Sequence, residues 1–573
     1  MGGRQPGDHA TRGHRAQVGT SARLCYNAGV TRTHRTAALR AFAPAWLGGE
    51  RAAREFLPAG FEEHEARVAA VRRAAARRCD PALLAALAGQ QRCLPSSVAR
   101  DRHLGMLAGG GAATVVSGQQ VGLFTGPAFT LYKAAGVVAT AKRLSEESGV
   151  PCVPLFWLQT EDHDWPEIDH CIVRGPDGEP RCITVHGDDA PARASVAART
   201  FDAGIEAALD SLDEALATKP HAADVAALLR RHYRCGESPA SAFRGVLAEL
   251  FADEGLLFLD PRTREVAALA RPLLERGLAE AEPLAAVLVS RAATIEAAGL
   301  AVQVPVREGA PLCFFHPDGA SGPRYRLEPR GDHWRLCDTD REVSRDEALR
   351  LIGEDPLRFS SSALLRPLVQ DRLLPNAMYL AGPGEIAYFA ELAPLYEALD
   401  VAMPLVAPRP SFCVTGAGDR RRLEALGLGF ADVGGARDEV LARLSRPREG
   451  DAFDPDRVAA ALTTDFHARL DEFAARAVAL DENLGRPIDK ARAAVEHAVA
   501  RLADKYRHSV LYRDAVLVER LDRVRAALAP GGVPQERCYG FASLAAEHGI
   551  AELLAAIRGT FEPFDASTME VRL

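Results

Sequence analysis

The chain has 573 residues, of which 47% are hydrophobic, and a formal net charge of −8 at pH 7. A chain of this length can bury a large core, and it exceeds one compact domain of ordinary size. Because nucleic-acid-binding proteins usually carry a net basic face, the acidic balance argues against that class. No apolar run approaches the roughly 20 residues that a membrane-spanning helix needs. The 11 cysteines include no C-x-x-C pair, which is typical of reduced thiols, so we expect a cytoplasmic protein.

The first 35 residues differ from the rest of the chain. Residues 1–35 are rich in Arg, Gly and Thr, nearly free of acids, and contain no apolar stretch of the secretory type. We interpret residues 1–35 as a disordered tail or as the product of a start codon assigned too early, with a transit peptide as the weaker alternative. From Thr36 to about Arg102 the spacing of apolar residues predicts helices.

Short continuous apolar runs then alternate with helical segments. The runs at residues 114–116, 152–157, 256–260, 302–306 and 378–381 are predicted strands. Buried strands separated by helices predict a parallel sheet covered on both faces, so we expect an α/β core over residues 36–415. Insertions occupy about residues 171–360. They comprise a hairpin turning at 175–178, helices from about 200 to 250, and a small β-meander from 312 to 337.

The α/β pattern stops after Arg409 and Pro410, and residues 416–530 are predicted to form a long helical hairpin. From Asp454 the chain is helical for about 75 residues, with one apolar stripe on each arm and a break at residues 484–487. Such a hairpin cannot bury both of its edges alone, so we expect a partner subunit or the core to cover one face. Residues 531–573 form a short segment that is expected to pack back on the core.

The first motif that indicates chemistry is SGQQVGLFTGP at residues 117–127, between a predicted strand and a predicted helix. Its glycines allow a tight turn and a close approach to a ligand, Pro127 suits the first position of a helix, and free N–H groups there favour an anion. The segment is neither G-x-G-x-x-G nor a Walker loop, and a plain strand-to-helix turn is the alternative. Lys133, further into the helix, is either a phosphate ligand or a surface lysine. The candidate residues are Gly118, Gln119, Gln120, Gly122, Thr125 and Gly126.

The second motif is Glu-Asp-His-Asp at residues 161–164, directly after the strand at 152–157. Ligands of parallel sheets bind beyond the carboxyl ends of the strands, where this loop belongs. Two acids beside His163 raise its basicity and fix its tautomer. Asp164, a candidate binding residue, also suits an ordinary helix N-cap. A metal site built from His163, Glu167 and His170 is a weaker alternative, because His163 precedes the helix, and we predict no metal.

The third motif runs from Ser360 to Leu392. Arg366 and Gln370 are spaced to share one face of a helix, and a strand then meets a Gly-Pro-Gly turn with anion-binding character. Each residue alone is more often solvated or capping, but together they supply what a carboxylate-rich or phosphate-bearing ligand needs. The candidate binding residues are Arg366, Gln370, Gly382, Gly384, Glu385, Tyr388 and, after the next apolar run, Arg409.

Five segments in the same order resemble the bacillithiol-biosynthesis cysteine-adding enzyme family, BshC: SGQQVGLFTGP, FWLQTEDHDWPEIDH, LLRPLVQDRLLP, AGPGEIAYFAEL and VPQER. The resemblance covers most of the chain from about Thr36. It implies a Rossmann-like core with connecting-peptide insertions, similar to HIGH-type nucleotidyltransferases, and a coiled-coil hairpin that forms a homodimer. Two features depart from the family. One is the N-terminal extension, and the other is the lack of H-I-G-H and K-M-S-K-S sequences, so ATP use does not follow from the nucleotidyltransferase likeness.

The resemblance implies addition of cysteine to glucosaminyl-malate, giving bacillithiol. We assign catalysis to Gln119, Glu161, Asp162 and His163. One acid is expected to pair with the cysteine ammonium, His163 to accept the proton of the attacking amine, and Arg366 and Arg409 to hold malate carboxylates. The reacting carboxylate needs activation, which leaves ATP or another phosphoryl donor open. The alternatives are a nucleotidyltransferase-like enzyme acting on a different carboxylic acid, a tRNA-charging enzyme, and a non-catalytic coiled-coil assembly protein.

Overall fold

The computed structural model describes residues 39–57, 60–185, 190–449 and 455–573, and the tail expected at residues 1–35 lies outside them. The helices predicted up to Arg102 are present, and the last of them continues to Gly109. They are α1 (Phe42–Leu47), α2 (Arg51–Arg54), α3 (His64–Ala75), α4 (Pro81–Arg92) and α5 (Val98–Gly109). Side chains cap the starts of α4 and α5, where Asp80 and Ser97 accept backbone N–H groups of the first turn.

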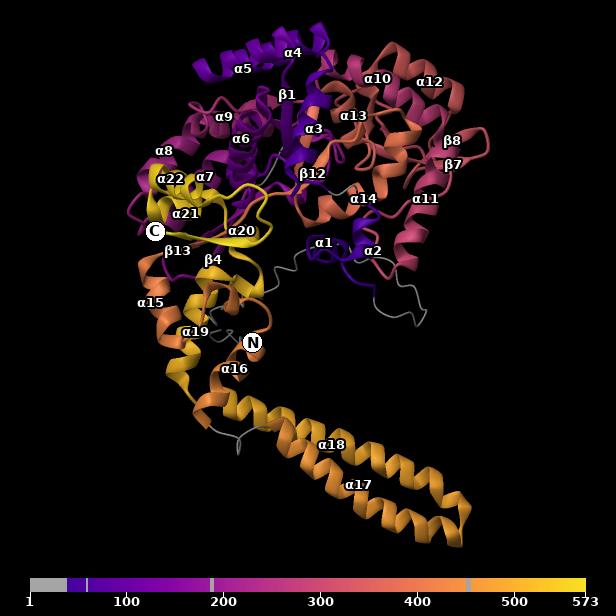
Figure 1. Cartoon of the computed structure of the whole chain (residues 1–573), viewed down its shortest axis with the longest axis vertical. Coiled ribbons are helices and arrows are strands. Elements are labelled where there is room, and N and C mark those ends of the chain that lie inside the picture. Colours follow the sequence, from indigo (N-terminus) through magenta and orange to yellow (C-terminus); the bar gives the residue numbers. More distant parts are fainter. Residues whose placement is uncertain (1–38, 58–59, 186–189, 450–454) are drawn as a thin grey trace, which may run out of the picture. The chain divides into compact units, whose positions relative to one another are not determined.

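A five-stranded parallel sheet forms the framework of the α/β part (Figure 1). In spatial order its strands are β12 (Leu405–Pro408), β11 (Asn376–Ala381), β1 (Ala113–Gln119), β2 (Cys152–Leu158) and β5 (Leu257–Leu259). The strands predicted at 114–116, 152–157, 256–260 and 378–381 are therefore confirmed. Counted along the chain this is the Rossmann order 3-2-1-4-5, which reverses between β1 and β11. Ligands of such sheets bind beyond the carboxyl ends of the strands at that reversal.

Both faces of the parallel sheet are covered. All seven residues of β2 are buried, as are the first six of β1, whereas a strand exposed on one face alternates. Helix α6 (Phe129–Ser148) packs on β1, β2 and β11, and α3 packs on β1 and β11. Helix α14 (Pro383–Ala398) packs on β11 and β12, and α4 packs on β5. This two-sided burial is the physical origin of the continuous apolar runs that predicted a parallel sheet.

Two insertions interrupt the sheet. The first follows β2 and contains the predicted hairpin, β3 (His170–Arg174) and β4 (Pro180–Thr184), with helices α7 (Gly204–Leu216), α8 (Ala222–His232) and α9 (Pro239–Leu250). The second lies between β5 and β11 and contains helices α10 (Arg264–Ala279), α11 (Ala281–Ala297), α12 (Arg345–Glu354) and α13 (Arg366–Leu373). The predicted β-meander belongs to its antiparallel sheet, ordered β10 (Phe359–Ser361), β6 (Cys313–Phe315), β7 (Tyr325–Arg330), β8 (His333–Leu336) and β9 (Glu342–Ser344).

The strand predicted at residues 302–306 is wrong, because this segment pairs with no strand of the described residues. Its backbone bonds to a side chain instead: the N–H groups of Gln303 and Val304 donate to Oε1 of the buried Glu391 at 2.7 and 3.2 Å. Pro305 has no N–H to offer to a ladder. An apolar run therefore lies against α14 as an irregular segment, which apolar periodicity alone does not distinguish from a strand.

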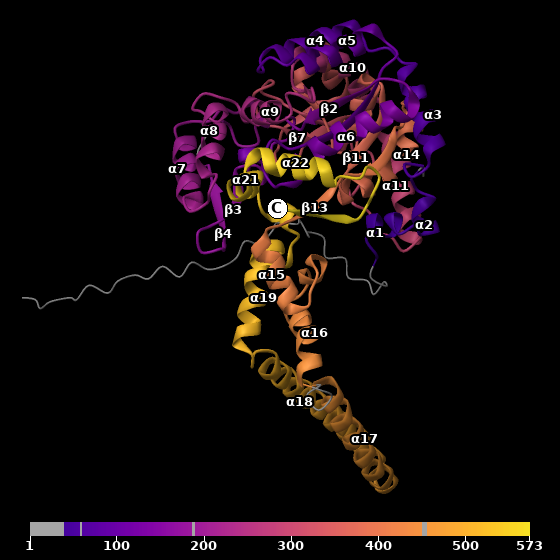
Figure 2. The same cartoon turned by 60° about the vertical axis from the view of Figure 1, so that its left-hand side comes forward.

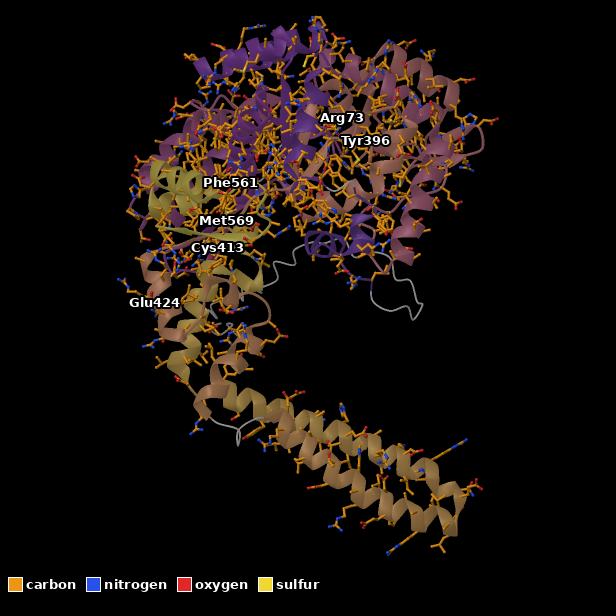
Figure 3. The ribbon with its side chains drawn as sticks, viewed as in Figure 1. Arg73, Tyr396, Cys413, Glu424, Phe561 and Met569 are labelled. Atoms are coloured by element: carbon orange, nitrogen blue, oxygen red, sulfur yellow. The ribbon has the colours of Figure 1, made fainter. Side chains whose placement is uncertain are left out.

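The prediction that the α/β pattern ends at Pro410 is wrong by one strand. β13 (Ser411–Thr415) pairs in parallel with β14 (Thr568–Arg572), 157 residues further along the chain. Cys413 of β13 and Met569 of β14 mark this small sheet in Figure 3. Helices α20 (Gln535–Cys538), α21 (Phe541–His548) and α22 (Ile550–Thr560) precede β14. Buried side chains of α21 and α22 belong to the same apolar cluster as the parallel sheet.

Helices α17 (Pro455–Leu480) and α18 (Gly485–Leu511) lie side by side as the helical hairpin (Figure 2). With 26 and 27 residues, each spans about 40 Å. The second arm is shorter than predicted, because it is interrupted after Leu511 and Asp514 caps a separate helix, α19 (Ala515–Leu528). Helices α15 (Ala417–Leu426), α16 (Arg437–Glu449) and α19 share a second, smaller apolar cluster. No helix among the described residues is long and apolar enough to cross a membrane.

Candidate active site

The two loops singled out in the sequence lie side by side at the carboxyl ends of β1 and β2. The N–H of Gln159 donates to the carbonyl of Gln119 at 3.0 Å, which extends the strand pairing by one step. One residue further, Nε2 of Gln120 donates to Oδ2 of Asp162 at 3.0 Å. The loop at 117–126 and the loop at 161–164 therefore share one edge of the sheet, beside the reversal of strand order.

The carboxylates of Glu161 and Asp162 are both held by the second insertion. Glu161 accepts the N–H and the hydroxyl of Ser361, at 3.1 and 2.5 Å. Asp162 accepts its neighbour's N–H at 2.7 Å and Nη1 of Arg324 at 3.2 Å. Burial raises the pKa of Asp162, but the hydrogen bonds from His163 and Gln120 and the charge of Arg324 outweigh it, so its pKa lies well below the usual range. Asp162 is therefore ionised at neutral pH.

His163 presents an imidazole that is partly exposed. Its side chain is 28% exposed, and its ring lies beside that of Phe314, with the centroids 6.2 Å apart. Nδ1 lies 3.3 Å from Nη1 of Arg324 and 3.4 Å from Oδ1 of Asp162. One ring nitrogen thus faces the protein, and within the described residues no hydrogen-bond partner is recorded for Nε2.

Asp164 and Glu167 add two carboxyl groups beside the same loop. Asp164 is the N-cap residue of a short 3-10 helix, Trp165–Glu167, as the alternative interpretation had it, although its side chain makes no capping hydrogen bond. Burial and the neighbouring Asp162 raise the pKa of Asp164. Burial also raises the pKa of Glu167, although Gln120 donates to it. A carboxylate with a raised pKa is a better proton acceptor than one with an ordinary pKa.

Metal ligation was the weaker alternative for this loop. His170 contacts Asp169, with Nδ1 to Oδ1 at 3.0 Å, rather than His163 or Glu167. In the part of the chain that the structure describes, no group of three His, Cys, Asp or Glu side chains is placed to hold a metal ion.

The glycine-rich loop uses most of its backbone N–H groups internally. Gly122 donates to the carbonyl of Gln120, Leu123 to that of Ile168, Thr125 to the hydroxyl of Tyr233 and Gly126 to the carbonyl of Leu123, at 2.8–3.0 Å. Thr125 and Gly126 have φ values of 73° and 67°, so the turn is tightly folded. These four N–H groups of the loop are thus bonded within the protein and are not free for an anion.

Gly118 lies within β1 and not in the turn. A Cβ atom there would lie 2.8 Å from the carbonyl oxygen of Trp157, on the neighbouring strand β2. Only glycine permits this close approach of the two backbones. Gly118 is therefore explained by strand packing beside the site.

The start of α6 is covered by the C-terminal segment. The helix begins at Phe129, two residues after Pro127, so the prediction that Pro127 is its first residue is wrong. The N–H of Ala128 donates to the carbonyl of Tyr539 at 2.8 Å, and Pro127 forms a β-bridge with Gly540. This helix terminus does not present an open anion site.

Lys133 is buried, with a side chain 3% exposed, so the surface-lysine interpretation is wrong. Its Nζ lies 2.6 Å from Oε2 of Glu385 and donates to the carbonyl of Gly118 at 2.7 Å and to Oε1 of Gln119 at 3.1 Å. An ammonium has three N–H donors, and these three partners use them all. Burial lowers the pKa of Lys133, and the charge of Glu385 opposes that shift. Lys133 links β1 to the turn after β11, across the reversal of strand order.

Glu385 closes that turn from the other side. Its Oε2 also accepts the N–H of Gly382 at 2.6 Å, as part of a capping box, and its Oε1 accepts the hydroxyl of Tyr379 at 2.7 Å. Burial raises the pKa of Glu385, but the charge of Lys133 outweighs it and the pKa is lowered. The helix start after Gly382 is therefore capped by its own carboxylate.

Arg366 and Gln370 share a helix face as predicted, and they contact each other. Nη1 of Arg366 donates to Oε1 of Gln370 at 3.0 Å, and Nη2 donates to the hydroxyl of Tyr388 at 3.0 Å. Gln370 is fully buried and donates onward to Asp371 at 2.9 Å. Of this group Tyr388 is partly exposed. Gly384, one helical turn before Tyr388, lies near the side chain of Gln303.

Arg409 is not placed to clamp a substrate carboxylate. Its two Nη atoms bind the two oxygens of Glu536, at 3.1 and 2.7 Å, and both side chains are 5% exposed. The bidentate face of the guanidinium is already occupied by a carboxylate of the chain itself. Arg409 thus joins the sheet edge to α20.

Sequence reasoning missed the residues that hold the loop at 161–164. Arg324 and Ser361 come from the second insertion, 162 and 200 positions from their partners. Behind them, Nη2 of Arg262 lies 3.0 Å from Nε2 of His316, and burial together with the charge of Arg262 lowers the pKa of His316 to about 2. Glu536 could have been identified, because it belongs to the family-like segment VPQER. No local sequence pattern indicates Arg324.

A separate pocket of about 680 Å³ lies away from these residues. It lies between the β3–β4 turn, the start of α15 and the helices before β14, and its charged lining includes Arg174, Lys219, Arg422, Arg523 and Glu547. Several of these charges are paired with one another, as in the contacts of Arg174 and Lys219 with Glu547 at 3.6 and 3.2 Å. None of the predicted site residues lines it.

Two family models match the chain in succession. Residues 32–410 match the bacillithiol biosynthesis BshC N-terminal Rossmann-like domain, and residues 420–571 match the BshC C-terminal coiled-coil domain. The chain belongs to the bacillithiol biosynthesis BshC family. As a member of that family it is a ligase, and the Rossmann-like match includes the loops at 117–126 and 161–164.

Individual members of the BshC family support this assignment over most of their length. A protein of Koribacter versatilis named "Putative cysteine ligase BshC" is 34% identical over 443 residues, which cover 77% of this chain and 80% of the relative. Proteins with the same name from Salinibacter ruber and Symbiobacterium thermophilum are 31% and 32% identical over 84% and 82% of this chain, and over 87% and 85% of their own length.

Proposed function

We propose that this BshC-family protein joins L-cysteine to glucosaminyl-malate through an amide bond, as the last step of bacillithiol biosynthesis. The relatives named as cysteine ligases support the cysteine part of the proposal. The observation that carries it is the loop at 161–164, whose three acids and one histidine follow β2. Asp162 of this loop contacts Gln120 at the end of β1, at the edge where this fold binds ligands.

Asp162 and Glu161 are suited to receive the cysteine ammonium. Asp162 is ionised at neutral pH and its side chain is 33% exposed, so it combines charge with access. Its Oδ1 is occupied by Arg324 and the backbone, and its Oδ2 accepts only one hydrogen bond from Gln120 among the contacts described. An ammonium bound there would meet a fixed carboxylate, which orients the substrate before reaction.

The sugar-linked substrate is assigned to the neighbouring carboxyl end of β11. Tyr388 is partly exposed there, and its hydroxyl is positioned by Arg366. Gly384 and Gln303 line the same turn. When the sugar amine attacks the activated carboxyl group of cysteine, the C–N bond forms, the bond to the activating group breaks, and that group leaves with the electron pair. The amine nitrogen then loses a proton, and Asp164 and Glu167 are suited to accept it because their pKa values are raised.

A free carboxylate must be activated before it forms an amide in water, and ATP or another phosphoryl donor would supply that chemistry. The N–H groups of Gly122, Leu123, Thr125 and Gly126 and the ammonium of Lys133 are bonded within the protein, so these groups do not fit a phosphate chain as they stand. No residue of this loop is assigned to the donor.

A homodimer through the helical hairpin completes the proposal. Large apolar side chains of α17 and α18 are exposed, among them Val458, Leu462, Phe473 and Leu502, at 40%, 46%, 60% and 58%. Contiguous exposed apolar groups on a helix usually mark a protein interface. A second copy would cover them. The cysteines in the described part of the chain are free, which suits the cytoplasm proposed for the enzyme.

The decisive experiment is an assay with the purified protein. Glucosaminyl-malate and cysteine are incubated with candidate phosphoryl donors, and the thiol product is followed by mass. We expect a product that requires both substrates and is not formed when serine replaces cysteine. Release of pyrophosphate without any dependence on cysteine would contradict the proposal and favour a nucleotidyltransferase-like enzyme acting on another acid.

A further inference from the structure

Arg324 is the buried cation of the candidate site. It lies just before β7 in the second insertion, with a side chain 6% exposed. Its Nε donates to the hydroxyl of Ser360 at 2.9 Å, and its Nη2 donates to the carbonyl of Ser361 at 2.8 Å. The guanidinium carbon lies 3.8 Å from the centroid of the Phe314 ring. These contacts fix the position of the guanidinium independently of the loop at 161–164.

The remaining nitrogen, Nη1, contacts two groups of that loop. It lies 3.2 Å from Oδ1 of Asp162 and 3.3 Å from Nδ1 of His163. A guanidinium carries only donors and keeps its charge throughout the accessible pH range. Two groups therefore compete for Nδ1 of His163: the N–H of Arg324 and, at 3.4 Å, Oδ1 of Asp162. The contact with Arg324 is the shorter one, and a proton on Nδ1 would set two donors against each other there, so we take Nδ1 to accept from Arg324. A neutral imidazole with an accepting Nδ1 carries its proton on Nε2.

We propose that Arg324 is a positioning residue that holds His163 in the tautomer protonated at Nε2, so that His163 presents a hydrogen-bond donor to a substrate oxygen. The matching ligand chemistry is an oxygen with partial or full negative charge, such as a carboxylate or the acyl oxygen of an amide-forming intermediate. This assignment rests on the proposed function for the identity of the substrate. The tautomer itself rests on contacts within the protein.

The proposal replaces the proton-accepting task expected for His163. A ring whose Nδ1 is bonded to a guanidinium and whose Nε2 carries a proton has no free lone pair for an incoming proton. Its value in catalysis is that of a preorganised donor at the point where negative charge develops. The second insertion thus supplies Arg324, which orients His163 and does not itself contact the substrate.

The tautomer can be read directly by magic-angle-spinning NMR of protein labelled with ¹⁵N-histidine. The His163 signals are identified as those lost in His163→Gln. We expect one unprotonated Nδ1 and one protonated Nε2 in the wild type, and a changed pattern in Arg324→Gln. Arg326→Gln is the matched control: Arg326 lies two residues away, contacts Glu328 and Cys337, and is 38% exposed. Its variant should keep the wild-type pattern.

Kinetics provide the second readout. Arg324→Lys keeps the charge but loses the forked geometry, and we expect kcat to fall about 10- to 100-fold, as for other residues that orient a catalytic ligand. His163→Gln keeps an N–H donor near the position of Nε2, so it should retain about tenfold more activity than His163→Ala. Circular dichroism checks that each variant is folded.

Two results would overturn the proposal. One is a wild-type spectrum with the proton of His163 on Nδ1, and the other is equal loss of activity in His163→Gln and His163→Ala. Absence of ligase activity in the wild-type protein would instead refute the proposed function. The NMR result would still decide the tautomer in that case, because it needs no substrate.

Discussion

The sheet edge and the helical hairpin distribute their side chains in opposite ways. At the sheet edge, buried cations are paired with carboxylates: Lys133 with Glu385, Arg324 with Asp162, and Arg409 with Glu536. On the hairpin, large apolar groups such as Phe473 and Leu502 are exposed. Buried charge and exposed apolar surface are both unusual in a stable protein, and each indicates a purpose other than folding. The first region is organised for small polar ligands, and the second for another protein surface.

The largest expected effect is on stability, and it shows whether a buried cation needs its carboxylate partner. Replacing Glu385 with Ala leaves Lys133 as an unpaired buried cation, which should lower the free energy of unfolding by about 3–5 kcal/mol. The exposed pair Arg350–Glu354, whose side chains are 56% and 58% exposed, provides the control. Glu354→Ala should change stability by no more than about 0.5 kcal/mol. Both variants are titrated with urea. Similar small losses in the free energy of unfolding would show that the buried pair contributes no more to stability than the exposed pair.

The next effect concerns catalysis at the sheet edge. His163→Ala removes a donor fixed at the site, and product formation should fall about 10²- to 10³-fold. The free energy of unfolding should change little, because the imidazole is partly exposed and packs loosely against Phe314. His333→Ala, at an exposed position of β8, should leave turnover unchanged. Turnover near the wild-type value in His163→Ala would reject the catalytic assignment.

A third effect depends on pH and on Glu391, which is buried under the segment at 302–306. Burial raises the pKa of Glu391 to about 7, against opposing hydrogen bonds from Gln303 and Val304. Since its pKa in an unfolded chain is about 4.3, its contribution to stability is complete below that pH and is lost as the pH rises through 7. The loss should be on the order of 3 kcal/mol.

The measurement is the stability of wild type and Glu391→Gln in urea at several pH values. The difference between the two should change between about pH 4 and pH 7, because the amide of the variant does not titrate in that range. A difference that is independent of pH would show that Glu391 has an ordinary pKa.

The smallest expected effect concerns the hairpin. Phe473→Glu places a charge in the exposed apolar stripe of α17, which should weaken the proposed homodimer at least tenfold, or about 1.4 kcal/mol. Sedimentation velocity over a concentration series measures this. Val98→Glu, at an 87% exposed position on α5, is the control and should leave assembly unchanged. A monomeric wild type, or a Phe473→Glu variant that assembles normally, would contradict dimerisation through the hairpin.

Much of the fold was predictable because its signals are local. The parallel strands are continuous apolar runs, and the hairpin arms repeat apolar residues at helical spacing. The segment at 302–306 was mistaken for a strand because an apolar run does not reveal that Glu391 accepts its N–H groups. The pairing of β13 with β14 was missed because it joins positions 157 residues apart.

The sequence predicted which loops form the candidate site, but it did not predict most of the side-chain contacts within it. Gln120 and Asp162 were identified, and they contact each other. Lys133 was identified without its partner, because burial of a lysine depends on a carboxylate from a distant turn. Arg324 was not identified, because the sequence around it does not distinguish a buried arginine from an ordinary solvated one. Only the tertiary contacts show that it is buried.

Tyr539 and Gly540 cover the start of α6, and this has a consequence for folding during synthesis. A nascent chain that has emerged from the ribosome only as far as residue 530 holds every strand of the parallel sheet, yet it lacks the residues that cover the glycine-rich turn and pair with Arg409. Maturation of the ligase therefore waits for the last forty or so residues. A truncation that removes residues 536–540 will therefore expose the start of α6 and leave Arg409 without its carboxylate partner.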